Sequence, residues 1–221
     1  MKPAPFELFA FWRTSATYRV RVALNLKGLQ AHERIVDMDA GEQRGEAFLK
    51  INPLAAIPAL LHGDAPPITQ SLAILEFLDE FQPAPPLLPP DLHGRARVRS
   101  LAAMLASDTH PLITPRVRSY LTGPGGFDDA AWRAWQQQWF GTGLKAFETR
   151  LRTESATGDF CHGDVPGTAD ICLASIMVVL PVFKIVVPDI PNVERIMTRC
   201  EALPAFAKAA PALQAGAPGA T

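Results

Sequence analysis

Cysteine is scarce in this sequence of 221 residues, and histidine is only slightly more common. The three cysteines, Cys161, Cys172 and Cys200, are odd in number and form no Cys-x-x-Cys pair. This pattern argues against a disulfide-stapled domain and a dithiol redox motif, and it predicts free thiols in a reducing cytoplasm. The five histidines are scattered without paired ligand spacing, so we expect no metal site.

An excess of charge is also lacking, and so is a long hydrophobic run. Lys+Arg 21 against Asp+Glu 22 leaves a formal net charge of -1, whereas nucleic-acid binders carry a strong basic excess. The longest apolar run, Ile171 to Val187, is interrupted by polar residues and a proline and is too short to span a bilayer. The segment Met1 to Phe6 has no apolar core, so we expect no signal peptide. Neither nucleic acid nor a membrane is therefore an expected partner.

Apolar residues are plentiful enough to build a core, because 48% of the chain is hydrophobic and 19% is charged. Up to residue 81, the spacing of these residues predicts the order β-α-β-α-β-β-α. The expected elements are a strand over 7–11, a helix over 15–27, a strand within 32–38, a short helix over 41–50, two strands over 57–61 and 67–69, and a helix over 70–81.

Proline is abundant, at 21 residues, and it is concentrated between Pro83 and Pro90. A stretch of this composition is typical of a stiff, extended linker. The segments that follow have helical patterns, over 93–120, 128–153, 168–180 and 191–202. We therefore predict an α/β domain over 5–83, a linker over 84–92 and an all-helical domain over 93–215.

Four segments carry motifs that point to one family. They read FWRTSATYRVRVAL over 11–24, INPLAAIPAL over 51–60, ITQSLAI over 68–74 and GDVPGTAD over 163–170. Together they resemble the cytosolic glutathione transferases, and specifically the zeta class, which includes the maleylacetoacetate and maleylpyruvate isomerases. The resemblance covers nearly the whole chain. It implies a thioredoxin-like domain followed by a helical one, glutathione as cofactor, a small electrophilic or unsaturated substrate, and a cytoplasmic homodimer.

The resemblance places glutathione on groups of the first domain. Pro58 would be cis, so that the N–H and carbonyl of Ile57 pair with the cysteinyl backbone of glutathione; otherwise it is a proline at the start of a strand. Gln70 and Ser71 would hold the γ-glutamyl carboxylate, although helix capping alone also explains them. Gln43 matches a glutathione contact of the family and is otherwise a solvated loop residue.

The expected chemistry centres on Thr14, Ser15 and Ala16, where the family pattern is Ser-Ser-Cys. A hydroxyl that donates a hydrogen bond to sulfur at a helix N-terminus favours the nucleophilic thiolate. By position, Thr14 is the first candidate for the activating hydroxyl and Ser15 is the second. The alternative is that both residues only cap the helix. Ala16 stands where the family has a cysteine, which changes the site without removing the thiol, because that belongs to glutathione.

The helical domain is expected to shape the substrate pocket. The segment 108–116 has two prolines that break a helix, and His110, Thr114 and Arg116 match glutathione or substrate positions of the family. A structural role for His110 and a plain surface role for Arg116 remain alternatives. Arg13 and Arg19 would add positive potential near the mouth of this substrate pocket, and Arg19 is equally suited to a structural ion pair.

Two departures from the family pattern bear on function. The family carries an arginine just before a Phe in a late helix, whereas this chain has Val182 before Phe183. Gly167 replaces the usual Ser or Thr at the start of that helix, with Asp170 retained. The resemblance as a whole predicts a glutathione-dependent cis–trans isomerase of a maleyl diketo acid, and the missing arginine favours the alternatives. The alternatives are a transferase or dehalogenase acting on apolar electrophiles, and a glutathione-binding protein without catalytic activity.

Overall fold

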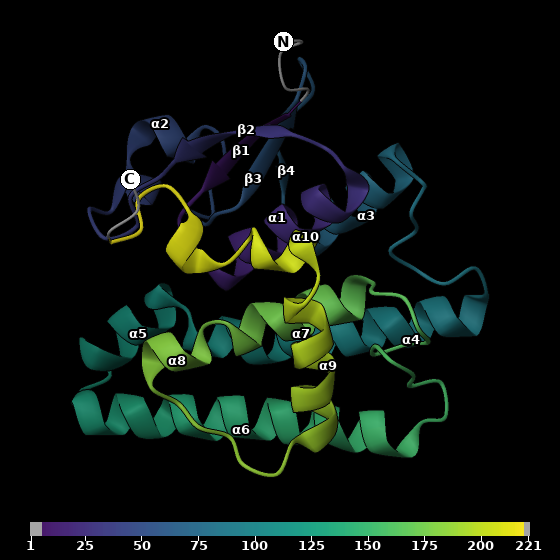
Figure 1. The fold of residues 1–221 in the computed structure, drawn as a ribbon. Coiled ribbons are helices and arrows are strands. Elements are labelled where there is room, and N and C mark those ends of the chain that lie inside the picture. The colour runs from purple at the N-terminus through teal and green to yellow at the C-terminus, as the bar shows by residue number, and fades with distance from the viewer. Residues whose placement is uncertain (1–5, 219–221) are drawn as a thin grey trace. The chain divides into compact units, whose positions relative to one another are not determined.

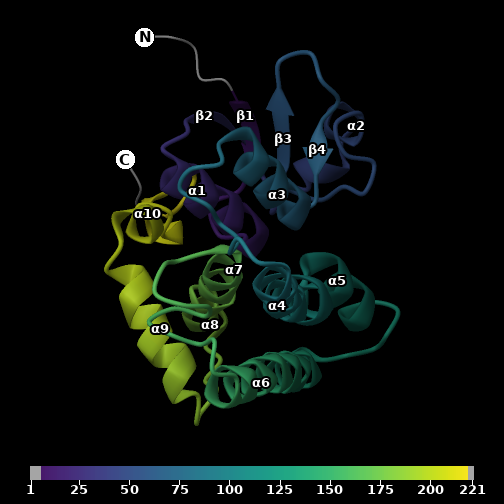
Figure 2. The same ribbon diagram turned by 90° about the vertical axis from the view of Figure 1, so that its right-hand side faces the viewer.

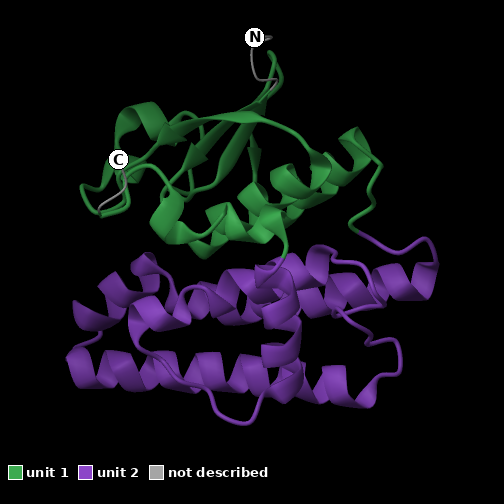
Figure 3. Cartoon of the chain, in the orientation of Figure 1, with its two compact units in different colours: residues 1–87, 203–221 green, residues 88–202 purple. Residues whose placement is uncertain are grey.

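The structure, a computed structural model, describes residues 6–218 and divides into two compact units (Figure 3). The first unit runs to Leu87 and takes up the chain again from Leu203, and the second comprises Leu88–Ala202. The predicted helical domain, 93–215, differs from this division at its end, because the segment after Ala202 belongs to the first unit. The predicted first boundary, at residue 5, and most of the segment expected not to be a signal peptide lie outside the described residues.

A four-stranded sheet forms the centre of the first unit (Figure 1). Its strands are β1 (Phe6–Ala10), β2 (Ala31–Ile35), β3 (Ala59–His62) and β4 (Ile68–Thr69). Their order is β2-β1-β3-β4; β1 pairs parallel with β2 and antiparallel with β3, which pairs antiparallel with β4. Together with the helices between them, these strands confirm the predicted β-α-β-α-β-β-α order.

Helices cover both faces of this sheet. The helices α1 (Ser15–Lys27) and α3 (Ser71–Phe81) pack together on one face, as Figure 2 shows. The short α2 (Glu46–Leu49) covers the other, where Phe48 meets Phe9 of β1 edge to face. Because side chains alternate along a strand, Phe9 points away from its buried neighbours in β1, which face α1 and α3.

Glycines set two of the helix boundaries in the first unit. Gly28 ends α1 in the left-handed conformation (φ 65°) that glycine adopts without steric cost, as predicted. The predicted helix over 41–50 is interrupted at Gly45, whose extended backbone separates a 3₁₀ turn (Glu42–Arg44) from α2. The C-terminal segment adds α10 (Pro204–Ala207) against α1, where Asn25 Nδ2 donates to the carbonyl of Ala205 across 2.8 Å.

The proline-rich stretch is held to the first unit at its start. The buried ammonium of Lys27 pairs with Asp79 and donates to the carbonyl oxygens of Gln82 and Pro85. The backbone N–H of Leu87 donates to the same Asp79 carboxylate across 2.8 Å. The start of the stretch predicted as a stiff linker has no regular secondary structure and is anchored to the first unit by these contacts.

The second unit is helical, and proline breaks its first long segment. It contains α4 (Leu92–Ala103), a π-helical stretch (Met104–Thr109), a 3₁₀ turn (His110–Ile113), α5 (Pro115–Thr122) and α6 (Asp129–Thr153). The segment 93–120, predicted to be helical with a break at its two prolines, is thus divided into four pieces. Pro111 and Pro115 stand in the first turns of the last two, where the missing N–H removes no hydrogen bond.

The core helix of the second unit is α7 (Thr168–Met177), in which every residue but the last is buried. It packs against α4 and α9 (Pro191–Glu201), and the single-turn α8 (Leu180–Phe183) follows it (Figures 1 and 2). Within the described chain, no helix combines the length and the hydropathy needed to cross a membrane.

Candidate active site

Helix α1 begins at the pair of hydroxyl residues in the first motif. Thr14 is its N-cap, with an extended backbone (φ -82°, ψ 127°), and the buried Ser15 is its first residue. Among the described residues, the Thr14 side chain accepts no capping hydrogen bond from the backbone of α1. Capping was the alternative role for this hydroxyl, and the geometry does not support it for Thr14.

The Thr14 hydroxyl meets a second hydroxyl from the same helix turn. Its Oγ1 lies 2.7 Å from Oγ1 of Thr17 and 3.4 Å from the carbonyl oxygen of Phe11. Thr14 is half-buried, whereas Thr17 is fully buried. Our sequence reasoning did not select Thr17. The signal that would have found it is its place three residues after the N-cap, where the two side chains of a helix start meet.

The second motif contains the predicted cis bond. The Ile57–Pro58 peptide is cis, which confirms that prediction. The Ile57 side chain is buried with Phe11 and Phe48. Strand β3 begins only at Ala59, opposite Phe9, so the backbone of Ile57 lies beyond the last residue that β3 pairs with β1. An extended peptide can add to such a position through main-chain hydrogen bonds.

The third motif opens helix α3. Gln70 is the N-cap, is exposed, and has a positive φ of 68°, while Ser71 is buried. The Gln70 side chain makes no capping hydrogen bond among the described residues, so it leaves the first-turn N–H groups of α3 uncovered. The Nε of Arg19, a buried residue of α1, donates to Ser71 Oγ across 2.9 Å. Arg19 thus contacts the start of α3 through the hydroxyl of Ser71.

Gln43 lies in the 3₁₀ turn before α2. It is buried, with an exposed fraction of 5%, and so is not the solvated loop residue of the alternative. Its side-chain oxygen has no hydrogen-bond partner within residues 6–218. A buried acceptor without a donor is rare and costs about 1–3 kcal/mol. A ligand N–H that reached this oxygen would remove that cost.

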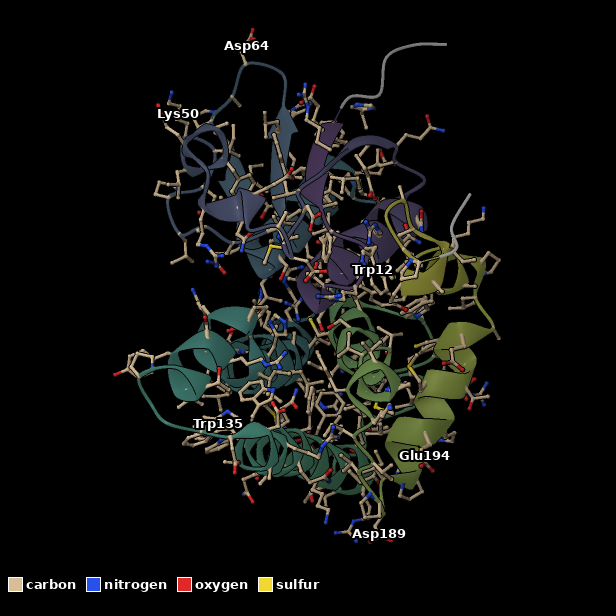
Figure 4. The ribbon with its side chains drawn as sticks, turned by 90° about the vertical axis from the view of Figure 1, so that its left-hand side faces the viewer. Trp12, Lys50, Asp64, Trp135, Asp189 and Glu194 are labelled. Carbon is tan, nitrogen blue, oxygen red and sulfur yellow. The ribbon has the colours of Figure 1, made fainter. Side chains whose placement is uncertain are left out.

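Arg13 lies between β1 and α1, and its side chain already has partners. Its guanidinium pairs with Asp39 and stands over the rings of Phe11 and Trp12, 5.3 Å and 5.4 Å from their centroids. Trp12 lies where the chain passes from β1 to α1 (Figure 4). These contacts hold the positive charge of Arg13 beside the start of α1.

The remaining candidates belong to the second unit. His110 begins the 3₁₀ turn; Thr114 is the N-cap of α5 and donates from Oγ1 to the carbonyl of Pro111 across 3.0 Å. Trp135 of α6 (Figure 4) fixes this segment, because its Nε1 donates to the carbonyl of Leu112 across 2.7 Å. Arg116 follows in the first turn of α5 and is exposed.

Where the family carries an arginine just before a Phe in a late helix, this chain has the apolar turn α8. An arginine of α6 lies beside this turn. Val182 in α8 keeps 45% of its surface exposed. Arg133, from α6, donates from Nη1 to the carbonyl oxygen of Phe183 across 3.3 Å. Our sequence reasoning missed Arg133 because it lies fifty positions before Phe183, and only the packing of α6 near α8 brings them together.

The cysteines take no part in this chemistry. All three are buried, and none forms a disulfide among the described residues. Burial raises the pKa of Cys161 and of Cys200, so both remain protonated and unreactive near neutral pH. In the described part of the chain, no group of three or more His, Cys, Asp or Glu residues is arranged to hold a metal ion.

The first unit therefore contains nine of the predicted site residues. They are Arg13, Thr14, Ser15, Arg19, Gln43, Ile57, Pro58, Gln70 and Ser71. Direct contact joins Arg19 to Ser71. The other three, His110, Thr114 and Arg116, lie within seven consecutive residues of the second unit.

Comparisons with known proteins identify the family. A sequence profile described as glutathione S-transferase, N-terminal domain, matches residues 15–80. A probable maleylacetoacetate isomerase of Vibrio cholerae is 38% identical over 92% of this chain and 94% of its own. The chain belongs to the zeta-class glutathione transferases. This confirms both the predicted family and the predicted class of enzyme.

Solved structures agree with this assignment. A maleylacetoacetate isomerase from Methylobacterium extorquens, determined with bound malonate and glutathione, is 48% identical, with a TM-score of 0.94 over 96% of this chain and 99% of that chain. A zeta-class maleylpyruvate isomerase in its holo form is 37% identical, with a TM-score of 0.92 over 96% and 100%. The transferase fold predicted from the sequence, with its thioredoxin-like first domain, is thus confirmed.

Proposed function

We propose that this enzyme is a glutathione-dependent isomerase that converts a maleyl diketo acid from the cis to the trans form. The observation that carries the proposal is the 48% identical relative, a maleylacetoacetate isomerase that holds glutathione together with malonate, a dicarboxylate. The substrate class follows from that relative and from the maleylpyruvate isomerase. Residues of this chain would bind glutathione, activate its thiol and hold the substrate.

Groups of the first unit fit the parts of glutathione. The Ile57 backbone, beyond the paired end of β3, would take the cysteinyl backbone as an added strand. The Ser71 hydroxyl and the uncovered N–H groups at the start of α3 would bind the γ-glutamyl carboxylate, because a helix N-terminus attracts anions. The unpartnered oxygen of Gln43 would accept an N–H of the ligand.

The hydroxyl at the start of α1 would hold the sulfur in its reactive form. When bound, glutathione supplies a thiol whose thiolate form can add reversibly to an activated double bond, which allows rotation about that bond. Thr14 is placed to donate a hydrogen bond to such a sulfur, and the positive end of α1 favours its negative charge. Ser15 is the second candidate and is more deeply buried.

Arginines of the second unit would hold the carboxylates of the substrate. Arg116 is exposed at the start of α5, next to Thr114 and close to His110 in sequence. A guanidinium can bind a carboxylate through two parallel hydrogen bonds. Arg133 beside α8 is a further candidate, because it stands near the turn that lacks the family's arginine.

A second candidate function is supported by α8 itself. The exposed Val182 would favour an apolar electrophile over a dicarboxylate, as in a transferase or dehalogenase that uses the same activated thiol. Both functions need glutathione and Thr14, so they differ only in the electrophile. We also propose that the enzyme acts in the cytoplasm as a homodimer, which the mass in size-exclusion chromatography with light scattering would test.

The deciding experiment measures turnover with two classes of substrate in the presence of glutathione. We expect maleylacetoacetate or maleylpyruvate to be isomerised, and haloacids and haloaromatics to be conjugated slowly or not at all. Arg116→Ala should raise the KM of the isomerisation and leave the affinity for glutathione unchanged. Rapid conjugation of haloacids without isomerisation would replace the isomerase by the second function. Calorimetry without any heat of glutathione binding would overturn both.

A further inference from the structure

The first turn of α1 contains two hydroxyls, and only one of them has access to a ligand. Thr14 is the half-buried N-cap, and Thr17 is the fully buried third residue of the helix. Their oxygens are 2.7 Å apart, the usual distance for a hydrogen bond between two hydroxyls. Either hydroxyl can rotate to donate, so the environment decides the direction.

The environment favours donation from Thr17 to Thr14. Within residues 6–218, Thr14 Oγ1 is the one hydrogen-bond partner of the Thr17 hydroxyl. If Thr14 donated, the Thr17 hydrogen would be buried without an acceptor, which costs about 1–3 kcal/mol. If Thr17 donates, its hydrogen is satisfied and the Thr14 oxygen accepts. The hydrogen of Thr14 then needs another acceptor.

The resting acceptor for the Thr14 hydrogen is weak. The carbonyl oxygen of Phe11 lies 3.4 Å away, well beyond the ordinary length of about 2.7–2.8 Å for such a bond. A sulfur anion at the open side of Thr14 would therefore compete for this hydrogen easily. A hydroxyl that already accepts a hydrogen bond is also a stronger donor, because the bonds in a chain polarise one another.

We propose that Thr17 is a positioning residue, which donates to Thr14 and thereby commits the Thr14 hydrogen to the sulfur of glutathione. The inference rests on the proposed function, because it assumes that Thr14 faces the thiol. Thr17 itself is too deeply buried to touch the ligand. Its effect should therefore appear in the ionisation of the bound thiol and not in the affinity for the rest of glutathione.

The test is a pH titration of the ultraviolet absorbance of the thiolate in the binary complex. Thr17→Val keeps the shape of the side chain and removes the donor, while Thr17→Ser keeps the donor. We expect Thr17→Val to raise the midpoint by about one pH unit, which leaves about tenfold less thiolate below it. Thr17→Ser should keep the wild-type midpoint. The affinity for S-methylglutathione, which has no ionisable thiol, should be unchanged in both.

Two results would overturn the inference, and they have different consequences. If the wild-type midpoint is shifted below that of free glutathione and Thr17→Val leaves it there, the positioning role is wrong and the proposed function stands. If the wild-type midpoint equals that of free glutathione, the proposed activation fails as well. Thr17→Ala replaces Thr17→Val should that variant not fold.

As a second test, the double variant Thr14→Val with Thr17→Val should shift the midpoint no further than Thr14→Val alone. Additive shifts of the two single variants would contradict the coupling between the two hydroxyls.

Discussion

Arg19 donates a hydrogen bond from Nε to the hydroxyl oxygen of Ser71 across 2.9 Å, and both side chains are buried. The bond joins the second turn of α1 to the first residue of α3. Because the guanidinium has only donors, the Ser71 oxygen must accept, and the hydroxyl hydrogen remains for another acceptor. The contact therefore orients Ser71 as a donor at the N-terminus of α3, which is the arrangement that suits a bound carboxylate.

Removing this hydroxyl should weaken glutathione binding. A hydrogen bond to a charged group contributes about 1.5–3 kcal/mol, so Ser71→Ala should raise the Kd by about 10- to 100-fold in titration calorimetry. Ser175→Ala is a matched control, because Ser175 is a buried serine of α7 in the second unit. Equal affinity in Ser71→Ala and wild type would show that Ser71 has only a structural role.

Removal of the Thr14 hydroxyl should reduce kcat/KM more than removal of the Ser15 hydroxyl. If the Thr14 hydroxyl lowers the thiol pKa by about two units, from about 8.5 to about 6.5, Thr14→Val will leave about 25-fold less thiolate at about pH 7 and reduce kcat/KM accordingly. Ser15→Ala should reduce it less. The pH–rate profile of each variant provides the measurement, and raising the pH should restore the activity of Thr14→Val. Near-wild-type rates in both variants would refute activation by either hydroxyl.

Gln43 should affect stability and binding in opposite directions. Its buried side-chain oxygen has no partner in the described chain, so Gln43→Met, which is similar in size, should raise the free energy of unfolding by about 1 kcal/mol. The same variant should bind glutathione more weakly, because the acceptor is gone. Urea unfolding and calorimetry measure the two effects. A variant that is less stable than wild type and binds equally well would contradict the assigned role.

The parts of the fold that depend on local chemistry were predictable from the sequence. Helix α1 has its predicted bounds: Gly28 supplies the left-handed residue that ends it, and Thr14 precedes its first residue, although the Thr14 hydroxyl makes no capping hydrogen bond. The bond before Pro58 is cis as predicted, but that prediction came from the family resemblance, since most prolines follow trans bonds.

The remaining parts depend on contacts between distant segments. No local pattern shows that residues 203–218 return to the first unit, because that follows from α10 packing on α1. The partner of Arg19 stands 52 positions away, at the start of α3. The burial of Gln43 likewise depends on the fold around it, and its polar side chain alone indicated a solvated loop. Sequence reasoning therefore named these residues as candidates but did not reveal the contact between Arg19 and Ser71 or the burial of Gln43.

Asp170 should contribute to stability more than an exposed cap does. Its buried carboxylate accepts from the backbone N–H of Cys161 (2.8 Å) and of Gly167 (2.9 Å), although burial raises its pKa. Asp170→Ala would leave both donors without a partner and should lower the free energy of unfolding by about 2–4 kcal/mol. Asp128→Ala, at the exposed N-cap of α6, should cost about 1 kcal/mol. Equal losses in urea unfolding would contradict this account.

Glu154 should make the second unit sensitive to acid. It lies just after α6, and its carboxylate accepts hydrogen bonds from Arg150 (2.6 Å) and Arg97 (2.5 Å). These bonds, with that of Arg150 the larger, hold the pKa of Glu154 below its ordinary value. A carboxyl whose pKa is lower in the folded state stabilises the fold fully above its unfolded pKa of about 4.3, and this contribution is lost as the pH falls through the folded pKa.

Glu154→Gln removes the charge at every pH and so isolates this contribution. We expect the variant to be less stable than wild type by about 1 kcal/mol above about pH 5, a value reduced because 31% of the Glu154 side chain is exposed. The difference should shrink as the pH falls below about 4, because wild-type Glu154 then becomes neutral too. Urea unfolding at a series of pH values measures it. Glu46→Gln, in an exposed pair with Lys50, should show no such dependence. A difference between Glu154→Gln and wild type that stays constant down to pH 3 would show that the two arginines gain nothing from the charge of Glu154.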